Sequence, residues 1–172
     1  GISIMKINSK LDEGPICSSY KINIDKNDKA ESLSEKLSIV ASEKILDDID
    51  NILDNKAVFK NQNHTKATYA KKIEKKEFNI NWDIPAKNII ANIKGLNGAV
   101  FFFKGARYKI VDAELNNLSG LPGEVISDSL DIACKEMSIK VLEIQREGKR
   151  PQKTSEFLLG SQIKRGCFLN NV

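Results

Sequence analysis

Hydrophobic and polar residues nearly alternate along two short stretches at the start of the chain. The hydrophobic positions before and after the intervening loop are Ile2, Ile4, Ile7 and then Ile16, Tyr20, Ile22, Ile24. Alternation of this kind is typical of strands with one buried face. The loop, residues 11–15, reads Leu-Asp-Glu-Gly-Pro. We therefore expect a strand, a tight Gly-Pro turn that fixes an acidic residue, and a second strand.

Between residues 29 and 55 the pattern changes to a helical period. Hydrophobic residues recur near every 3.6 positions, and Asp28 and Glu31 suit a helix start. A helix of about 24 residues is about 36 Å long, and two short strands cannot cover its apolar stripe. We therefore expect residues 1–60 to be the end of a larger α/β domain whose earlier strands precede this sequence.

Residues 61–80 are polar and basic and indicate a linker. Beyond Trp82, a short helix after Pro85 and a hairpin, with strands at 99–103 and 107–114, are expected. Further expected elements are strands at 124–127, 130–134 and 139–145, a helix at 155–159, and a last strand or tail at 162–172. Five short strands and a helix indicate a small barrel, with residues 101–103, three phenylalanines, mainly in its core.

Charge differs between the two parts of the chain. Residues 1–60 carry 9 Lys and Arg against 11 Asp and Glu, whereas residues 61–172 carry 18 against 12. A basic second part suits a polyanion such as RNA; the alternative is a general compositional bias toward Lys and Asn. The three cysteines lie far apart, without metal-ligand spacing, and fit a reducing, cytoplasmic setting. No apolar run approaches the ~18 residues of a membrane span.

Four motifs occur in one order along the chain. They are residues 11–15, residues 68–73 (Thr-Tyr-Ala-Lys-Lys-Ile) with Ile80-Asn81-Trp82, residues 121–126 (Leu-Pro-Gly-Glu-Val-Ile) and residues 144–150 (Ile-Gln-Arg-Glu-Gly-Lys-Arg). In order and spacing they resemble the folate-dependent formyltransferases, and among them the methionyl-tRNA formyltransferase family. The resemblance spans nearly the whole chain.

The resemblance implies an α+β chain: the C-terminal remnant of a Rossmann-like α/β formyltransferase domain (1–60), a basic linker (61–80) and a small OB-like β-barrel (81–172). It implies transfer of a formyl group from 10-formyltetrahydrofolate to methionyl-initiator tRNA, without a metal, by a cytoplasmic, monomeric enzyme. Asp12 would be catalytic, and Leu11, Glu13, Gly14 and Pro15 would border the folate. Basic residues of the linker and barrel would bind tRNA: Lys66, Lys71, Lys72, Lys75, Lys76, Lys104, Arg107, Lys109, Arg146, Lys149 and Arg150.

The same resemblance predicts that the chain alone is inactive. The family's Asn-x-His motif, which precedes the aspartate loop, does not occur here, and His64 lies in the linker as an expected bystander. Tyr69 is expected to anchor the linker by burial rather than to stack on a base.

Alternative interpretations remain at this point. The chain is also compatible with a sugar-nucleotide formyltransferase, or with a non-enzymatic RNA-binding module. Asp-x-Gly also occurs in ordinary turns, and linker lysines can simply be solvated.

Overall fold

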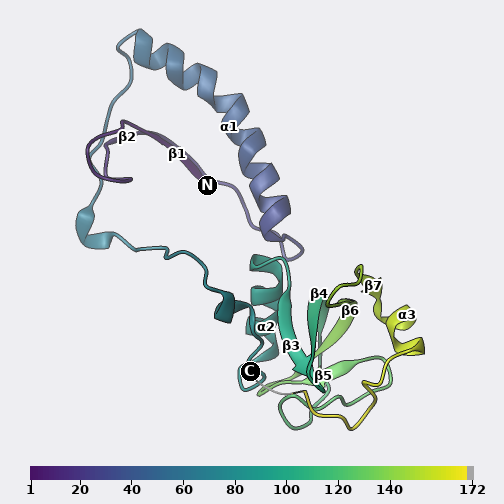
Figure 1. The fold of residues 1–172 in the computed structure, drawn as a ribbon. Coiled ribbons are helices and arrows are strands. Elements are labelled where there is room, and N and C mark those ends of the chain that lie inside the picture. The colour runs from purple at the N-terminus through teal and green to yellow at the C-terminus, as the bar shows by residue number, and fades with distance from the viewer. Residues whose placement is uncertain (170–172) are drawn as a thin grey trace. The chain divides into compact units, whose positions relative to one another are not determined.

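The computed structural model describes residues 1–169 and divides into two compact units, residues 1–72 and 73–172. We call them the N-terminal unit and the C-terminal unit (Figure 1). No helix among the described residues is both long and apolar enough to span a bilayer.

The N-terminal unit consists of an antiparallel hairpin and one long helix. Strands β1 (Ile2–Met5) and β2 (Ile16–Tyr20) pair with a register shift after Ile4, and α1 spans Ala30–Leu53. The predicted strands and helix are thus present. The predicted tight turn is wrong: both strands are shorter than expected, and residues 6–15 form a long loop in which Ile7 is 89% exposed.

The start of α1 also differs from the predicted cap. Lys29 occupies the N-cap position, and its N–H donates to Ser32 Oγ at 3.0 Å. The Asp28 carboxylate instead accepts from the Asp25 N–H at 2.8 Å and pairs with Lys36. The hydrogen bond from Lys36 lowers the pKa of Asp28, and the Asp25 and Asp28 carboxylates raise the pKa of Lys36.

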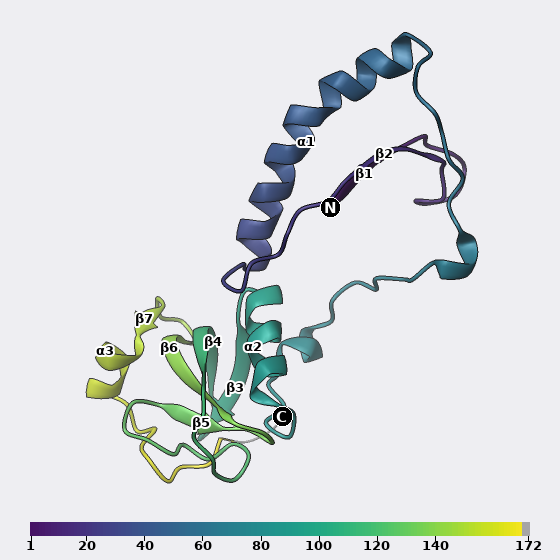
Figure 2. The same cartoon turned by 180° about the vertical axis from the view of Figure 1, so that it is seen from behind.

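The C-terminal unit is a curled antiparallel sheet with small helices. After a short 3-10 helix, η2 (Lys75–Phe78), come α2 (Ala86–Gly95), β3 (Ala99–Phe103), β4 (Ala106–Asn116), β5 (Asp131–Ala133), β6 (Ser138–Arg146), β7 (Gln152–Lys153) and α3 (Thr154–Leu159). The sheet order is β3-β4-β6-β5, with β7 paired to β6. Figures 1 and 2 show α2 and α3 on opposite sides of the long strands.

Irregular pairing of the two long strands accounts for the curl. The β4–β6 register shifts twice, between Ile110 and Asp112 and between Asp112 and Ala113. Such bulges bend a strand and increase its twist. The result is a half-barrel that encloses one core.

Large hydrophobic side chains from every part of this unit fill the core. Trp82 and Phe101 are 1% and 0% exposed, with ring centroids 6.1 Å apart, and Phe101 stacks on Tyr108 at 5.3 Å. Phe103 is also buried, so the predicted core role of residues 101–103 is confirmed for two of the three phenylalanines.

One predicted strand of this unit is wrong, and the prediction of a strand or tail at 162–172 is a tail over its described part. Residues 124–127 make only isolated bridges, Glu124 with Phe168 and Val125 with Ile132. Residues 162–169 form no strand, because they follow the edge of the core through single hydrogen bonds such as Leu169 N–H to Gly123 O at 2.8 Å. The end of that prediction, 170–172, lies outside the described residues.

Candidate active-site loop and basic cavities

The loop between β1 and β2 holds the predicted catalytic residue, and backbone contacts fasten both of its ends. The Lys6 N–H donates to Pro15 O at 3.0 Å. Ile16 then pairs with Lys60 through two backbone hydrogen bonds of 2.8 and 2.9 Å. The segment after α1 therefore runs beside the end of the loop.

Gly14 is buried where the loop passes closest to the other strand. A Cβ at this position would lie 1.6 Å from Lys6 O. Only glycine permits this approach, because any side chain would overlap fixed backbone atoms. The Gly-Pro pair of the motif thus sets the shape of the loop.

Asp12 lies at the exposed side of this loop with φ of +55°. Asp and Asn are the non-glycine residues most often found in this left-handed conformation. Its neighbours differ in environment: Leu11 is 90% exposed, and Glu13 pairs with Lys10 at 3.4 Å. The loop therefore brings together the predicted catalytic and folate-bordering residues, with an open apolar side chain beside the carboxylate.

Gln62 reaches this loop from the segment after α1. Its Nε2 donates to Asp12 O at 2.8 Å and to Gly14 O at 2.7 Å, and lies 3.8 Å from Met5 Sδ. Sequence reasoning placed Gln62 in the linker. Nothing in the sequence distinguishes it from its polar neighbours Asn61 and Asn63, because the contact depends on how the chain returns past the hairpin.

A buried carboxylate attaches α1 to β2. Asp48 is 5% exposed and accepts from Ser18 Oγ at 2.8 Å and from the Tyr20 hydroxyl at 3.1 Å. Burial, followed by the hydrogen bond to Asp48, raises the pKa of Tyr20. Sequence analysis missed this contact, since the helical period marks only the hydrophobic positions of the buried face.

The linker side chains are largely exposed. Lys66, Lys71 and Lys72 are exposed within the N-terminal unit. His64 begins the 3-10 helix η1 (His64–Lys66) at the surface. Tyr69 is 90% exposed, so its predicted role as a buried anchor is wrong: residues 67–74 form no helix or strand, and their side chains are exposed.

Three of the predicted tRNA-binding residues surround one cavity of the C-terminal unit. Lys75, Lys76 and Arg107 line a space of about 610 Å³ together with Phe78 and Asn79. Part of this charge is compensated, because Lys76 pairs with Glu74 at 2.8 Å and Arg107 lies 3.9 Å from Glu147. We call this space the η2 cavity.

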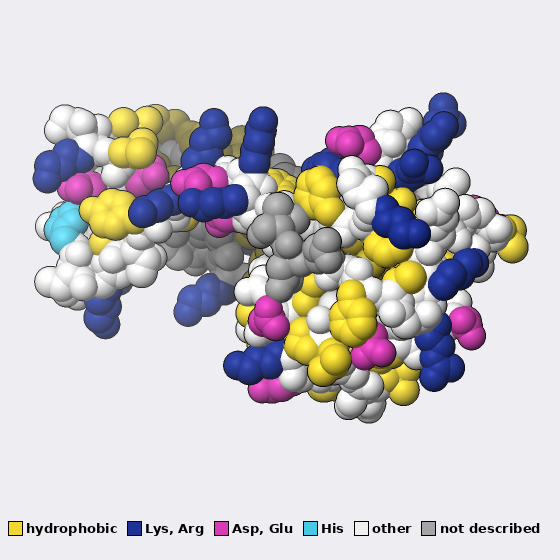
Figure 3. Space-filling view, turned by 60° about the horizontal axis from the view of Figure 1, so that its bottom comes forward, with side chains coloured by type: hydrophobic (Ala, Val, Ile, Leu, Met, Phe, Trp, Pro, Cys, Tyr) yellow, Lys and Arg dark blue, Asp and Glu magenta, His cyan; other side chains and the backbone are white. Residues whose placement is uncertain are grey.

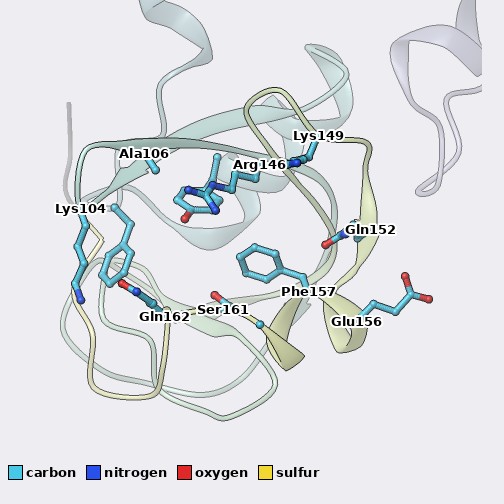
Figure 4. A pocket seen from close by; sticks show the side chains of 12 residues that line it. Lys104, Ala106, Arg146, Lys149, Gln152, Glu156, Phe157, Ser161 and Gln162 are labelled. Carbon is cyan, nitrogen blue, oxygen red and sulfur yellow. The ribbon is translucent and has the colours of Figure 1, made fainter.

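Three others surround a second space of about 550 Å³, which we call the α3 cavity. Its basic residues are Lys104, Arg146 and Lys149, and its aromatic residues are Phe103, Tyr108 and Phe157. Figure 4 shows the Phe157 ring directed into the cavity, whereas the Glu156 carboxylate points outward. Phe103 and Tyr108 are each only 8% exposed and belong to the core, so the aromatic surface of the cavity comes mainly from the half-buried Phe157. Positive charge beside an aromatic ring is the combination that holds single-stranded nucleic acid.

The remaining two predicted residues line neither cavity. Lys109 is half-buried, and its carbon stem lies over Gly98, while Arg150 is exposed in the connection between β6 and β7. Figure 3 shows Lys and Arg side chains gathered over part of the C-terminal unit beside hydrophobic patches. Within residues 1–169, no cluster of three or more His, Cys, Asp or Glu is placed to hold a metal ion.

Comparison with known families gives a match over the second part of the chain. Residues 72–162 match the family model described as formyl transferase, C-terminal domain.

Curated relatives match over nearly the whole chain. A protein of Pelagibacter ubique named methionyl-tRNA formyltransferase is 54% identical over 176 residues, which cover 100% of this chain and 57% of that protein. Proteins of the same name from Cereibacter sphaeroides and Bradyrhizobium diazoefficiens are 37% and 35% identical, over 98% and 97% of this chain and 56% of each relative. The chain thus spans somewhat more than half the length of these relatives.

Solved structures share the fold. A variant of HypX from Aquifex aeolicus superposes with a TM-score of 0.67 at 15% identity, covering 99% of this chain and 35% of HypX. HypX in complex with tetrahydrofolic acid gives 0.66 at 13% identity, over 99% of this chain and 33% of that one.

Proposed function

The chain belongs to the formyltransferases, whose C-terminal domain it carries, and we propose that it is the rear part of a methionyl-tRNA formyltransferase. The observation that carries this proposal is that relatives with that name match over nearly the whole of this chain. The match includes the Asp12 loop as well as the C-terminal domain. The reaction would transfer the formyl group of 10-formyltetrahydrofolate to the amino group of methionyl-initiator tRNA.

Asp12 is the residue of this chain that we assign to the chemistry. The methionyl nitrogen forms a bond to the formyl carbon, the bond from that carbon to N10 of the folate breaks, and the proton lost by the amine goes to N10. A carboxylate beside the reacting atoms can orient a neighbouring acid-base group and relay this proton through water. Asp12 has the exposure and the fixed backbone needed for that role.

Residues of the same loop would border the folate. Leu11 offers an exposed apolar side chain, and Gly14 and Pro15 offer backbone and ring surface, while Glu13 shapes the loop through Lys10. The shared fold with HypX, which has been solved with tetrahydrofolic acid, supports a folate as the formyl donor.

The apolar surface of α1 supports an incomplete catalytic domain. Leu46 is 67% exposed, Leu53 is 72% exposed, and Ile39 and Ile49 are 51% and 42% exposed. Helices of folded domains bury such a stripe. We propose that residues 1–60 end a Rossmann-like domain whose remaining part, supplied by sequence upstream, covers this face and completes the active site.

The basic residues of the second part would hold the tRNA. The α3 cavity and the η2 cavity each combine three cations with an aromatic side chain, and Lys66, Lys71 and Lys72 of the linker are exposed. Contacts to phosphates release counterions and make the affinity depend steeply on salt. We propose that the half-barrel is OB-like and serves as the tRNA-binding domain of a monomeric, cytoplasmic enzyme.

The test compares the 172-residue chain with a protein that also includes the upstream part of its gene. The longer protein should formylate methionyl-initiator tRNA with 10-formyltetrahydrofolate, and Asp12→Asn should remove most of the rate. The 172-residue chain should show no turnover but should bind initiator tRNA, with affinity falling as salt rises. Turnover by the short chain, or formylation of an amino-sugar nucleotide in place of the tRNA, would contradict the proposal.

A further inference from the structure

One side chain outside the Asp12 loop makes hydrogen bonds to the interior of that loop. Between its two fastened ends, the contacts within the loop are local, such as Lys10 N–H to Asn8 Oδ1 at 3.1 Å. Among residues 1–169, Gln62 is the side chain from elsewhere that hydrogen-bonds to it, and it does so twice. The two acceptors, Asp12 O and Gly14 O, flank Glu13.

We propose that Gln62 is a positioning residue for the catalytic Asp12; the inference rests on the function proposed above. A primary amide has two N–H donors on one nitrogen, and both are used here, one for each carbonyl. A residue in the left-handed region persists only where its surroundings hold it there. The bond to Asp12 O holds the peptide that follows this residue, and therefore the direction of its Cα–Cβ bond, from which the carboxylate extends.

The origin of Gln62 makes this contact specific. Lys60, two residues earlier, pairs with Ile16, so the amide is presented from a strand-like segment rather than from a free linker. Gln62 is half-buried, whereas Asn61 and Asn63 on either side are exposed. The chain after α1 thus acts as the support of the active-site loop.

The side chain of Gln62 also suits the distance and chemistry required. Asparagine is one methylene shorter, and a glutamate of the same shape would offer a carboxylate to two carbonyl oxygens, with no donor at neutral pH. Misplacement of a catalytic group by about 1 Å can cost about 100-fold in rate. Loss of the Gln62 amide should therefore lower kcat through Asp12.

The first test is a double-mutant cycle in the protein that includes the upstream region. Gln62→Ala and Gln62→Glu should lower kcat by about 10- to 100-fold and leave KM for folate and tRNA within about twofold. In an Asp12→Asn background, Gln62→Ala should have less than about a threefold further effect, because residues that act as a unit are non-additive. Asn61→Ala, an exposed neighbour, should leave the kinetics unchanged.

The second test uses the 172-residue chain and does not depend on activity. In ¹⁵N relaxation measurements, the backbone order parameters of residues 11–14 should fall toward the flexible range, below about 0.6, in Gln62→Ala and Gln62→Glu, but not in Asn61→Ala. Unchanged order parameters in the Gln62 variants would overturn the inference whatever the enzyme does.

The outcomes of the two tests separate the inference from the function. An equal rate loss from Gln62→Ala in both backgrounds would show a general structural role and overturn the proposal for Gln62. If Asp12→Asn leaves the rate unchanged, the assignment of Asp12 fails, and the positioning role fails with it, even where the order parameters fall.

Discussion

Gly123, in the Leu-Pro-Gly motif, allows a sharp test of how the C-terminal unit is held together. Its φ is +83°, and a Cβ there would lie 2.7 Å from Leu169 O and 3.2 Å from Trp82 Cδ1. Its own backbone is fixed on both sides, by Gly123 N–H to Ala133 O at 2.9 Å and by Leu169 N–H to Gly123 O at 2.8 Å. Gly123→Ala therefore combines backbone strain with a steric overlap.

The cost of each part follows from the structure. An alanine in the left-handed region costs about 1–2 kcal/mol. Relief of the overlap with Leu169 O requires backbone movement that weakens the two neighbouring hydrogen bonds, each contributing about 1 kcal/mol. We expect Gly123→Ala to lower the free energy of unfolding of this unit by about 2–4 kcal/mol.

Urea denaturation followed by the fluorescence of Trp82, the single tryptophan, measures this directly. Gly148 has φ of +72° with no atom within 4 Å of its Cβ position, so Gly148→Ala should cost only the strain, about 1–2 kcal/mol. Gly95 lies in α2, also with no atom within 4 Å of its Cβ position, so Gly95→Ala should raise the free energy of unfolding by about 0.4–1 kcal/mol. If Gly123→Ala and Gly148→Ala destabilise equally, the packing argument is refuted.

Three further predictions concern binding, reactivity and pH. Arg146→Ala should reduce the slope of log K against log salt for initiator tRNA by about one, in fluorescence anisotropy titrations; an unchanged slope would remove Arg146 from the interface. Burial raises the pKa of Cys134 to about 12, so iodoacetamide at pH 8.5 should leave it unmodified in peptide mass spectra while the half-exposed Cys17 reacts; equal labelling would contradict its burial. The pKa of Asp28 is lowered and that of Lys36 is raised, so their pairing should stabilise α1 above about pH 4 and below about pH 10. In circular dichroism melts, Lys36→Ala should therefore differ from the unmodified chain at pH 7, and the difference should shrink as the pH falls below the lowered pKa of Asp28; a constant difference would rule out the pair as its cause.

Local pattern was sufficient to predict the main elements. The helical period between residues 29 and 55 predicted α1 to within two residues at each end. A hydrophobic stripe that recurs over about seven turns fits a helix and does not fit a strand. The strands on either side of residues 104–105 followed from alternation and turn chemistry. Predictions failed where elements are short: residues 124–127 have strand-like composition but form only single bridges.

The candidate site divides in the same way. Leu11, Asp12 and residues 13–15 are consecutive, so the sequence alone placed the predicted catalytic and folate-bordering residues in one loop. Gln62 and Asp48 were missed, because their partners lie 48 or more and 28 or more residues away. A polar side chain carries no sign in the sequence of which distant carbonyl or hydroxyl it will meet.

The sequence by itself determined the helices, the hairpins and the chemistry that each segment offers, since these depend on neighbours a few positions apart. Only the tertiary structure decided that Gln62 holds the Asp12 loop, and that Lys104, Arg146 and Lys149 face one aromatic cavity. The physical reason is that register shifts and chain crossings, which set these contacts, arise from the packing of the whole core and leave no period along the chain.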